Sequence, residues 1–257
     1  MRKTAVSGIA ITLGLGVLWT GTVRAQDDIP TGMEVLDHMT EVLTPVNSSG
    51  IMRQTITTST GQKRTFELES FSANKGEKSL MRYQKPASVR GQAFLMLNNA
   101  DDIWTYFPRT NRVRKLASHA KKQKVQGSDF TYEDMGSGDS WKKEYNPVNL
   151  GEEKYEGQKC WKLQCTAVPE EEPSYSQIMI WVQQDNYHPL RIDYYEEDEL
   201  LKSLYMYDIQ EVDGYPTATR MIMRNHQEAT ETSMEIISVS YSWEPPAGFF
   251  SERNLKK

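Results

Sequence analysis

The sequence has few of the residues from which catalytic and metal centres are built. It contains two cysteines and four histidines in 257 residues, and these do not recur at the paired spacing of a structural zinc site. The chain lacks a Gly-x-Ser-x-Gly elbow, a His-Glu-x-x-His motif and a phosphate-binding glycine loop. We therefore expect no enzyme activity, no catalytic residue, no metal and no cofactor.

An excess of positive charge is missing too. The chain has 30 Lys and Arg against 35 Asp and Glu, a formal net charge of −5, which gives no general attraction to nucleic acid. Hydrophobic residues make up 38% and charged residues 25%, which is typical of a soluble globular protein. We expect no nucleic-acid partner and a single domain over residues 26–257.

Long apolar runs are confined to the N-terminus. Arg2 and Lys3 precede the apolar residues 5–19, and Val23-Arg24-Ala25 precedes Gln26. This pattern predicts a secretory signal peptide, residues 1–25, cut after Ala25. The alternative is a membrane anchor, for which the run is shorter than the about 20 residues that a span needs. We expect a secreted protein, located in the periplasm if the source is a Gram-negative bacterium.

One helix and a long series of strands follow. Thr31 and Glu34 have the spacing of a capping box, and apolar residues then recur at helical intervals as far as Leu43. Beyond Pro45, alternation with period 2 between turn signals predicts an antiparallel sheet, so the fold class is mainly β with helices. About eleven strands are expected, at residues 51–58, 64–73, 78–83, 92–97, 103–107, 159–168, 177–183, 190–195, 201–209, 217–224 and 233–243.

Several predicted strands are apolar on both faces, as where Phe94 and Met96 alternate with Leu95. Either one face packs on a helix while the other lines a cavity, or a curved sheet closes around a core. Aromatic and Met side chains suit irregular apolar ligands, although they would also fill an ordinary core. The candidate ligand-binding residues are Phe66, Leu68, Met81, Tyr83, Phe94, Met96, Trp104, Tyr106, Trp161 and Leu163.

A basic segment interrupts the predicted sheet. Between residues 109 and 124 the chain has seven basic residues and no acidic one: Arg109, Arg112, Arg114, Lys115, Lys121, Lys122 and Lys124. On an acidic protein this asymmetry predicts a rim loop that docks to anionic lipid headgroups or to an acidic partner, at about 1 kcal/mol per cation near a membrane surface. The alternative is a solvated loop without a partner.

The two cysteines are predicted to be free thiols. Cys160 and Cys165 lie in one predicted strand and on opposite faces of it. Five residues at about 3.3 Å each separate their Cα atoms by about 16 Å, well beyond the about 7 Å that a disulfide tolerates.

Two motifs give the sequence a family resemblance. The first is the run Leu-Met-Arg-Tyr-Gln-Lys-Pro at residues 80–86, with Trp-Thr-Tyr-Phe-Pro at 104–108. The second is Arg-Val-Arg-Lys at 112–115, followed by Gly-Ser-Asp-Phe-Thr-Tyr-Glu-Asp at 127–134. Both are similar to the LolA-like family of outer-membrane lipoprotein-sorting proteins. The resemblance implies an unclosed, strongly curved antiparallel β-barrel covered by helices, including the one at residues 34–43, with a concave apolar side that receives acyl chains.

The resemblance also implies a function. It suggests a periplasmic carrier that binds lipid or lipoprotein acyl chains and shuttles them between envelope components, with an envelope transporter or a membrane-bound acceptor as partner. The alternative is a lipid- or lipoprotein-sensing accessory protein of an envelope transporter or signalling complex. In LolA an arginine before the third strand helps to hold the lid, whereas Ala-Asn-Lys-Gly at residues 73–76 offers no arginine. The lid clasp of LolA is therefore not carried over to this chain.

Overall fold

The computed structural model of the chain describes Met1, residues 29–136 and residues 140–257. The predicted signal peptide, residues 1–25, lies outside the described residues except for Met1. Within the described part of the chain, none of the helices has the length and apolar character needed to cross a membrane.

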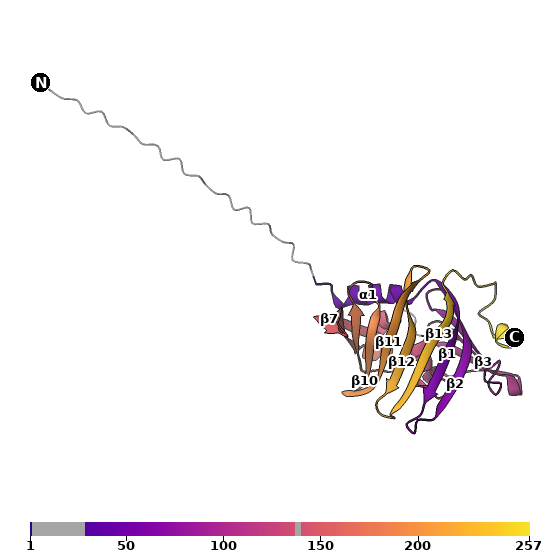
Figure 1. Cartoon of the computed structure of the whole chain (residues 1–257). Coiled ribbons are helices and arrows are strands. Elements are labelled where there is room, and N and C mark those ends of the chain that lie inside the picture. The colour runs from indigo at the N-terminus through magenta and orange to yellow at the C-terminus, as the bar shows by residue number, and fades with distance from the viewer. Residues whose placement is uncertain (2–28, 137–139) are drawn as a thin grey trace.

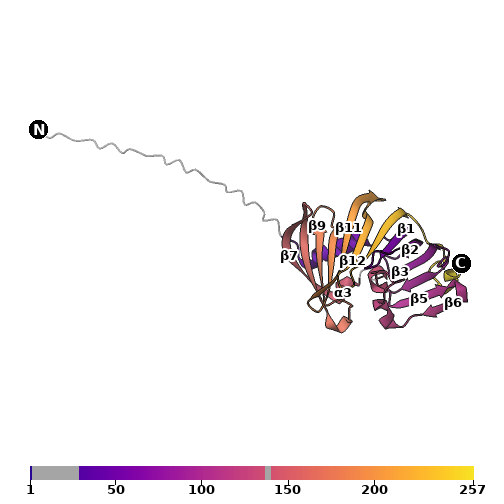
Figure 2. The same ribbon diagram turned by 60° about the horizontal axis from the view of Figure 1, so that its bottom comes forward.

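The described residues form one antiparallel sheet of 13 strands (Figure 1). The strands are β1 (Asn47–Thr57), β2 (Lys63–Ala73), β3 (Lys78–Lys85), β4 (Ala93–Leu97), β5 (Asp102–Phe107), β6 (Arg112–Lys115), β7 (Tyr145–Tyr155), β8 (Gln158–Ala167), β9 (Gln177–Gln183), β10 (Pro189–Glu196), β11 (Glu199–Val212), β12 (Tyr215–Asn225) and β13 (Thr230–Ser240). Their order is β6-β5-β4-β3-β2-β1-β13-β12-β11-β10-β9-β8-β7. The first strand thus pairs with the last, and β6 and β7 are the edges. The sheet is strongly curved but unclosed, as the resemblance implied (Figure 2).

The eleven predicted strands are confirmed with small shifts at their ends, and β6 and β7 were missed. The sequence predicts no strand between residues 107 and 159, and both missed strands lie in that interval. Three of the four residues of β6 are basic, which suits an edge strand because charge there discourages pairing with another chain. Strand β7 contains Pro147 and Gly151, which weaken the period-2 signal and are tolerated at an edge.

Helix α1 (Gly32–Leu43) lies across one end of the strands (Figure 1). Its predicted capping box is present: the Glu34 N–H donates to Thr31 Oγ1 at 3.2 Å, and the Thr31 N–H donates to Glu34 Oε2 at 2.7 Å. Val35, Leu36 and Met39 are buried against the sheet, so packing on the sheet adds to the capping that defines the helix.

The concave face of the sheet holds two buried clusters. One packs α1 against β8–β13 around Leu163, Ile180 and Met223, and the other lies over β1–β5 around Leu68 and Phe94. Met52 and Met135 pack against both clusters and thereby join them.

A C-terminal segment covers part of the convex face. Phe249, Phe250 and Leu255, the last of these in α4 (Glu252–Leu255), pack with Leu80 and Leu95. Strands β3 and β4 are apolar on both faces because both of their faces are covered.

The connection between the two edge strands runs over the concave side. Residues 116–144 link β6 to β7 and include α2 (Tyr132–Gly136) and α3 (Trp141–Glu144). Tyr132 packs into the cluster over β1–β5, and Trp141 packs against the cluster under α1. The described parts of the connection, residues 116–136 and 140–144, therefore contact both halves of the curved sheet.

Candidate functional site

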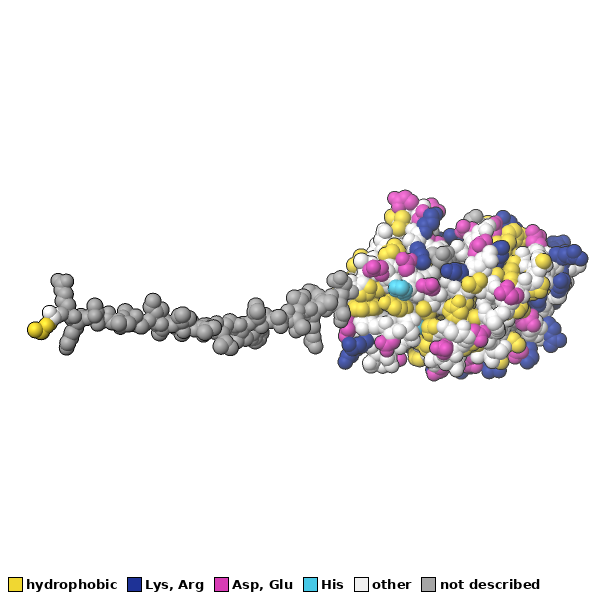
Figure 3. All heavy atoms as spheres, turned by 90° about the horizontal axis from the view of Figure 1, so that it is seen from above, with side chains coloured by type: hydrophobic (Ala, Val, Ile, Leu, Met, Phe, Trp, Pro, Cys, Tyr) yellow, Lys and Arg dark blue, Asp and Glu magenta, His cyan; other side chains and the backbone are white. Residues whose placement is uncertain are grey.

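A cavity of about 360 Å³ lies on the concave side, between α1, the two halves of the sheet and α2. Its volume falls in the range of small-molecule binding sites. Exposed hydrophobic side chains, including Met33, Leu43 and Val46, lie on and beside α1. Figure 3 views this end of the molecule, where hydrophobic side chains form a broken band among acidic and basic ones.

One wall of the cavity is apolar. Its side chains come from α1, β1, α2, α3, β10 and β11, and they include Met39, Leu43, Met52, Met135, Trp141, Ile192, Tyr194, Leu204 and Met206. Four of these nine are methionines, whose flexible thioethers adapt to ligands of irregular shape. This wall is suited to a flexible apolar ligand.

The other wall carries hydroxyl groups. Ser48 on β1 pairs with Ser72 on β2, and Ser72 pairs with Ser79 on β3. Directly paired residues of an antiparallel sheet point to the same face, so these three serines form a row across three strands. Ser70 lies in the neighbouring row, opposite Gly50. A side chain at Gly50 would lie 2.5 Å from the carbonyl oxygen of Ser238, so the close approach of β13 requires glycine there.

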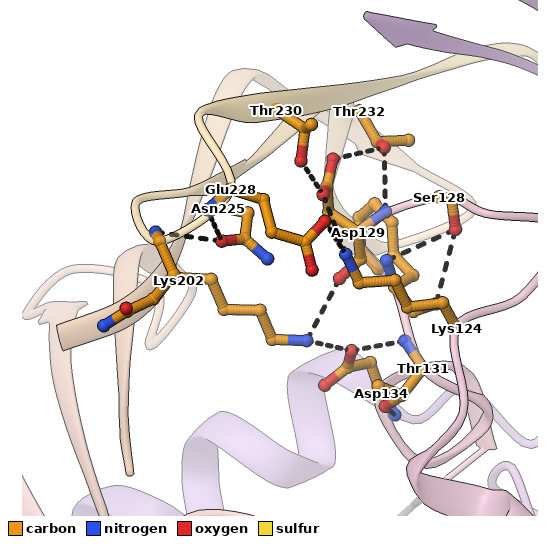
Figure 4. Close-up of polar contacts among 12 residues, drawn as sticks. Lys124, Ser128, Asp129, Thr131, Asp134, Lys202, Asn225, Glu228, Thr230 and Thr232 are labelled. Atoms are coloured by element: carbon orange, nitrogen blue, oxygen red, sulfur yellow. Dashed lines mark hydrogen bonds and ion pairs between the residues drawn. The ribbon is translucent and has the colours of Figure 1, made fainter. Parts of the chain in front are cut away.

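A buried polar network borders the cavity (Figure 4). Lys202 Nζ lies 2.5 Å from Asp134 Oδ2 and 3.1 Å from the carbonyl oxygen of Asp129. The Tyr175 hydroxyl donates to the other oxygen of Asp134 at 2.7 Å. Burial, followed by the negative charge of Asp134, raises the pKa of Tyr175 well above its usual value. Asp134 is thus held by a cation and a neutral donor.

Asp129 attaches the same segment to β13. Its two carboxylate oxygens accept from Thr230 Oγ1 at 2.5 Å and from Thr232 Oγ1 at 2.7 Å, and its N–H donates to Thr232 Oγ1 at 2.9 Å (Figure 4). Residues 127–134, the longer of the two motifs noted in the sequence, therefore fasten the connection between the edge strands onto the concave face.

Comparisons with known proteins bear on what this fold is. A family model described as "Uncharacterized protein" matches residues 75–257. The chain belongs to that family. No curated protein matches the sequence.

Solved structures show the same architecture. A DUF1329 family protein from Desulfovibrio piger is similar with a TM-score of 0.80 and 28% identity, over 87% of this chain and 97% of that one. A domain described as an outer membrane lipoprotein-sorting protein, from Vibrio parahaemolyticus, is similar with a TM-score of 0.78 and 27% identity, over 88% and 98%. A LolA superfamily protein from Nitrosomonas europaea has a TM-score of 0.73 and 20% identity, over 88% and 99%. The fold is LolA-like.

The structure divides the ten predicted ligand-binding residues among three places. Six lie together in the cluster over β1–β5: Phe66, Leu68, Met81, Tyr83, Phe94 and Met96. Trp161 and Leu163 pack in the cluster under α1. None of the ten is among the described residues that line the cavity. The role of these residues in ligand binding stays a prediction.

Trp104 and Tyr106 require a correction, because they lie on the convex side. In the register of β4 and β5, Trp104 pairs with Leu95 and Tyr106 pairs with Ala93. Both therefore face away from Phe94 and Met96, and they pack with the C-terminal segment. The sequence could not reveal this because β5 is apolar on both faces.

The basic segment is more structured than the expected rim loop. Residues 112–115 form edge strand β6, and three of the seven cations are in ion pairs: Lys115 with Asp102, Lys121 with Asp101 and Lys124 with Glu228. Lys122 donates to the carbonyl oxygen of Pro173 at 3.5 Å. Arg109, Arg112 and Arg114 are exposed and have no ion-pair partner among the described residues. These three carry what remains of the predicted docking surface.

Both cysteines are free, as predicted. Cys160 lies in a cluster on the convex side and Cys165 in the cluster under α1. Burial raises the pKa of the Cys160 thiol to about 11 and that of Cys165 to about 12, so neither forms a thiolate at neutral pH.

A serine, a histidine and an aspartate meet on the convex side, but not in a catalytic order. Ser203 Oγ donates to Asp193 Oδ1 at 2.6 Å and lies 2.9 Å from His226 Nε2. In a catalytic triad the histidine stands between the serine and the acid, whereas here the serine does. Ser203 is also completely buried.

No group of three potential ligands among His, Cys, Asp and Glu could hold a metal within the described residues.

Proposed function

We propose that this protein is a periplasmic carrier that holds an acyl chain of a lipid or lipoprotein in the cavity and shuttles it between components of the envelope, without catalysis. The observation that supports this most directly is the apolar wall of the cavity, set in a LolA-like fold. A similar structure at 27% identity is described as a lipoprotein-sorting domain.

The energetics explain why such a cavity would be useful. Moving a chain of about 16 carbons into water costs about 13 kcal/mol, at about 0.8 kcal/mol per methylene. A wall of methionine and aliphatic side chains nearly matches the apolar interior of a membrane. The free-energy change on loading the acyl chain from a membrane, or on releasing it to one, is then small. A site that bound the chain more tightly would stop release.

The size of the cavity limits what it holds in this conformation. An engineered cavity of about 150 Å³ binds benzene, so about 360 Å³ accommodates part of one acyl chain. A longer chain requires that the lining separates, and both α1 and α2 contribute to the lining. In our proposal, a shift of α1 or of α2 admits the chain, as in other proteins with movable covers.

The experiment is a transfer assay between donor and acceptor liposomes with a fluorescent acyl lipid. The wild-type protein should accelerate transfer in proportion to its concentration. Met206→Glu should abolish the acceleration, because it places an unpaired charge in the apolar wall. Tyr207→Glu is the matched control, since Tyr207 lies on the other face of β11 and pairs with Arg220.

Two outcomes contradict the proposal. A protein that neither binds the acyl lipid nor accelerates its transfer is not a lipid-binding protein. A protein that binds the lipid at equilibrium but leaves its transfer rate unchanged is not a carrier, and that result favours lipid sensing.

A further inference from the structure

The hydroxyl wall of the cavity contains an unpaired group. Ser79 is 5% exposed, and its Oγ has no hydrogen-bond partner among the described residues. A buried hydroxyl without a partner costs free energy, because it has given up water without gaining a replacement. Of the buried unpaired side-chain atoms in the described residues, Ser79 Oγ belongs to the one residue that also lines the cavity.

Ser79 is the end of an ordered row. Its neighbours Ser72 and Ser48 follow at the adjoining strands, each directly opposite the last, at intervals of about 5 Å between Cβ atoms. Ser72 and Ser48 also line the cavity. The row therefore offers several donors and acceptors to one ligand, facing the apolar wall.

Charge is lacking on this wall. The described residues that line the cavity include no Lys, Arg or His, and their one carboxylate, that of Asp134, already pairs with Lys202. An anionic group in the cavity would lose its hydration without gaining a cation, and it would meet the negative charge of Asp134. The cavity thus opposes an anion and favours neutral oxygen atoms.

We infer that the cavity selects an acyl group whose polar end is uncharged and rich in oxygen, as in a glycerol ester, with the Ser79 hydroxyl donating to an ester oxygen. This inference rests on the proposed function and names the ligand class of the same site. The acyl chain lies along the apolar wall and the glyceryl ester along the serine row. The shared chemistry, an acylglyceryl group, occurs in free lipid and in the modified cysteine of a lipoprotein.

The test uses displacement of N-phenyl-1-naphthylamine, an apolar fluorophore without an acceptor oxygen, from the full-length mature chain. The competitors are monodecanoylglycerol, decanoate and the anionic decanoyl lysophosphatidylglycerol. Monodecanoylglycerol should displace the fluorophore at a concentration about tenfold lower than either anion does. A peptide with a decanoylglyceryl cysteine, in the same assay, tells whether the group is preferred free or on a lipoprotein.

The decisive variant is Ser79→Ala. It should weaken binding of monodecanoylglycerol about fivefold to tenfold, the effect of one hydrogen bond, and leave the fluorophore and decanoate unchanged. The urea midpoint of the variant should stay equal or rise, because the unpaired hydroxyl is gone. A hydroxyl with a structural role would instead lower that midpoint. The control is Ser233→Ala, on the other face of β13, where Ser233 pairs with Thr55 and Ile222.

The outcomes separate this inference from the proposed function. If the fluorophore and all acyl competitors fail to bind, the proposed function itself is wrong. If they bind, but decanoate competes as well as the ester or Ser79→Ala changes nothing, then the selectivity for an uncharged ester is wrong and the acyl-binding function stands.

Discussion

The ammonium group of Lys202 on β11 lies 2.5 Å from a carboxylate oxygen of Asp134 on α2, and both side chains are 3% exposed. This pair joins the connection between the two edge strands to the concave face of the sheet. Asp134 also lines the cavity. The sheet is unclosed, so the relative position of its two halves depends on contacts of this kind.

Breaking this pair should destabilise the fold. Lys202→Met leaves Asp134 buried without its cation, which should lower the free energy of unfolding by about 3 kcal/mol. For a domain of this size the melting temperature should fall by about 6–12 °C. Urea and thermal unfolding measure both quantities. Lys162→Met is the control, since its ion pair with Glu153 is partly exposed and should contribute less than about 1 kcal/mol. Equal stability of Lys202→Met and the wild type would show that the pair does not fasten the connection.

The thiols should be free but slow to react. In urea and without reductant, a thiol reagent should label both Cys160 and Cys165, because they lie on opposite faces of β8. In the native protein labelling should be far slower, since burial raises the pKa of both thiols. Mass spectrometry of the labelled protein gives the count. An unlabelled pair in urea would mean a disulfide and would contradict the assignment of β8.

The stability of the protein should fall on mild acidification. His188 is 2% exposed, and burial lowers its pKa below the ordinary value near 6.5. As the pH falls through about 6.5 the unfolded chain takes up a proton at this site before the folded protein does, so the free energy of unfolding decreases. His188→Gln should therefore lose less stability than the wild type between about pH 7 and pH 5, measured by urea unfolding. His38→Gln, the same substitution at an exposed position, is the control. Identical pH profiles for His188→Gln and the wild type would exclude this histidine as a source of acid sensitivity.

Local patterns in the sequence predicted most of the fold, and contacts between distant segments decided the rest. The capping box of Thr31 and Glu34 and the alternation along eleven strands act within short stretches, so they could be recognised. The face on which Trp104 lies could not be recognised, because β5 has apolar side chains on both faces. The C-terminal segment covers those on the convex side. Strand β6 carried no apolar signal, since its exposed edge is charged.

The cavity was the least predictable feature. Its serine row requires the register of three strands, and its apolar wall combines residues of α1, β1, β10 and β11, which lie far apart in the sequence. Single serines within strands of alternating residues have no distinctive pattern in the sequence. The candidate residues chosen from the sequence were large apolar ones. Eight of the ten lie in the concave clusters beside the cavity, and Trp104 and Tyr106 lie on the convex side.

The three unpaired arginines should govern encounter with anionic membranes. Reversing Arg109, Arg112 and Arg114 to Glu should slow association with anionic liposomes, and added salt should slow the wild type but not the variant, because screening acts over about 8 Å at physiological salt. Acyl-chain binding should be unchanged. Reversing the exposed residues Lys63, Lys75 and Lys154 instead gives the same change in net charge and is the control. Equal slowing in both triple variants would show that association depends on net charge alone and that the three arginines do not form a docking surface.

The most direct test of the central claim, that the cavity holds an acyl chain, is native mass spectrometry of the protein purified from the cell envelope without detergent. We expect one bound acyl-bearing molecule per chain in the wild type and in Tyr207→Glu, identified after extraction, and none in Met206→Glu. A wild-type protein that carries no acyl-bearing molecule and takes none up from liposomes would contradict the claim, as would equal occupancy in Met206→Glu.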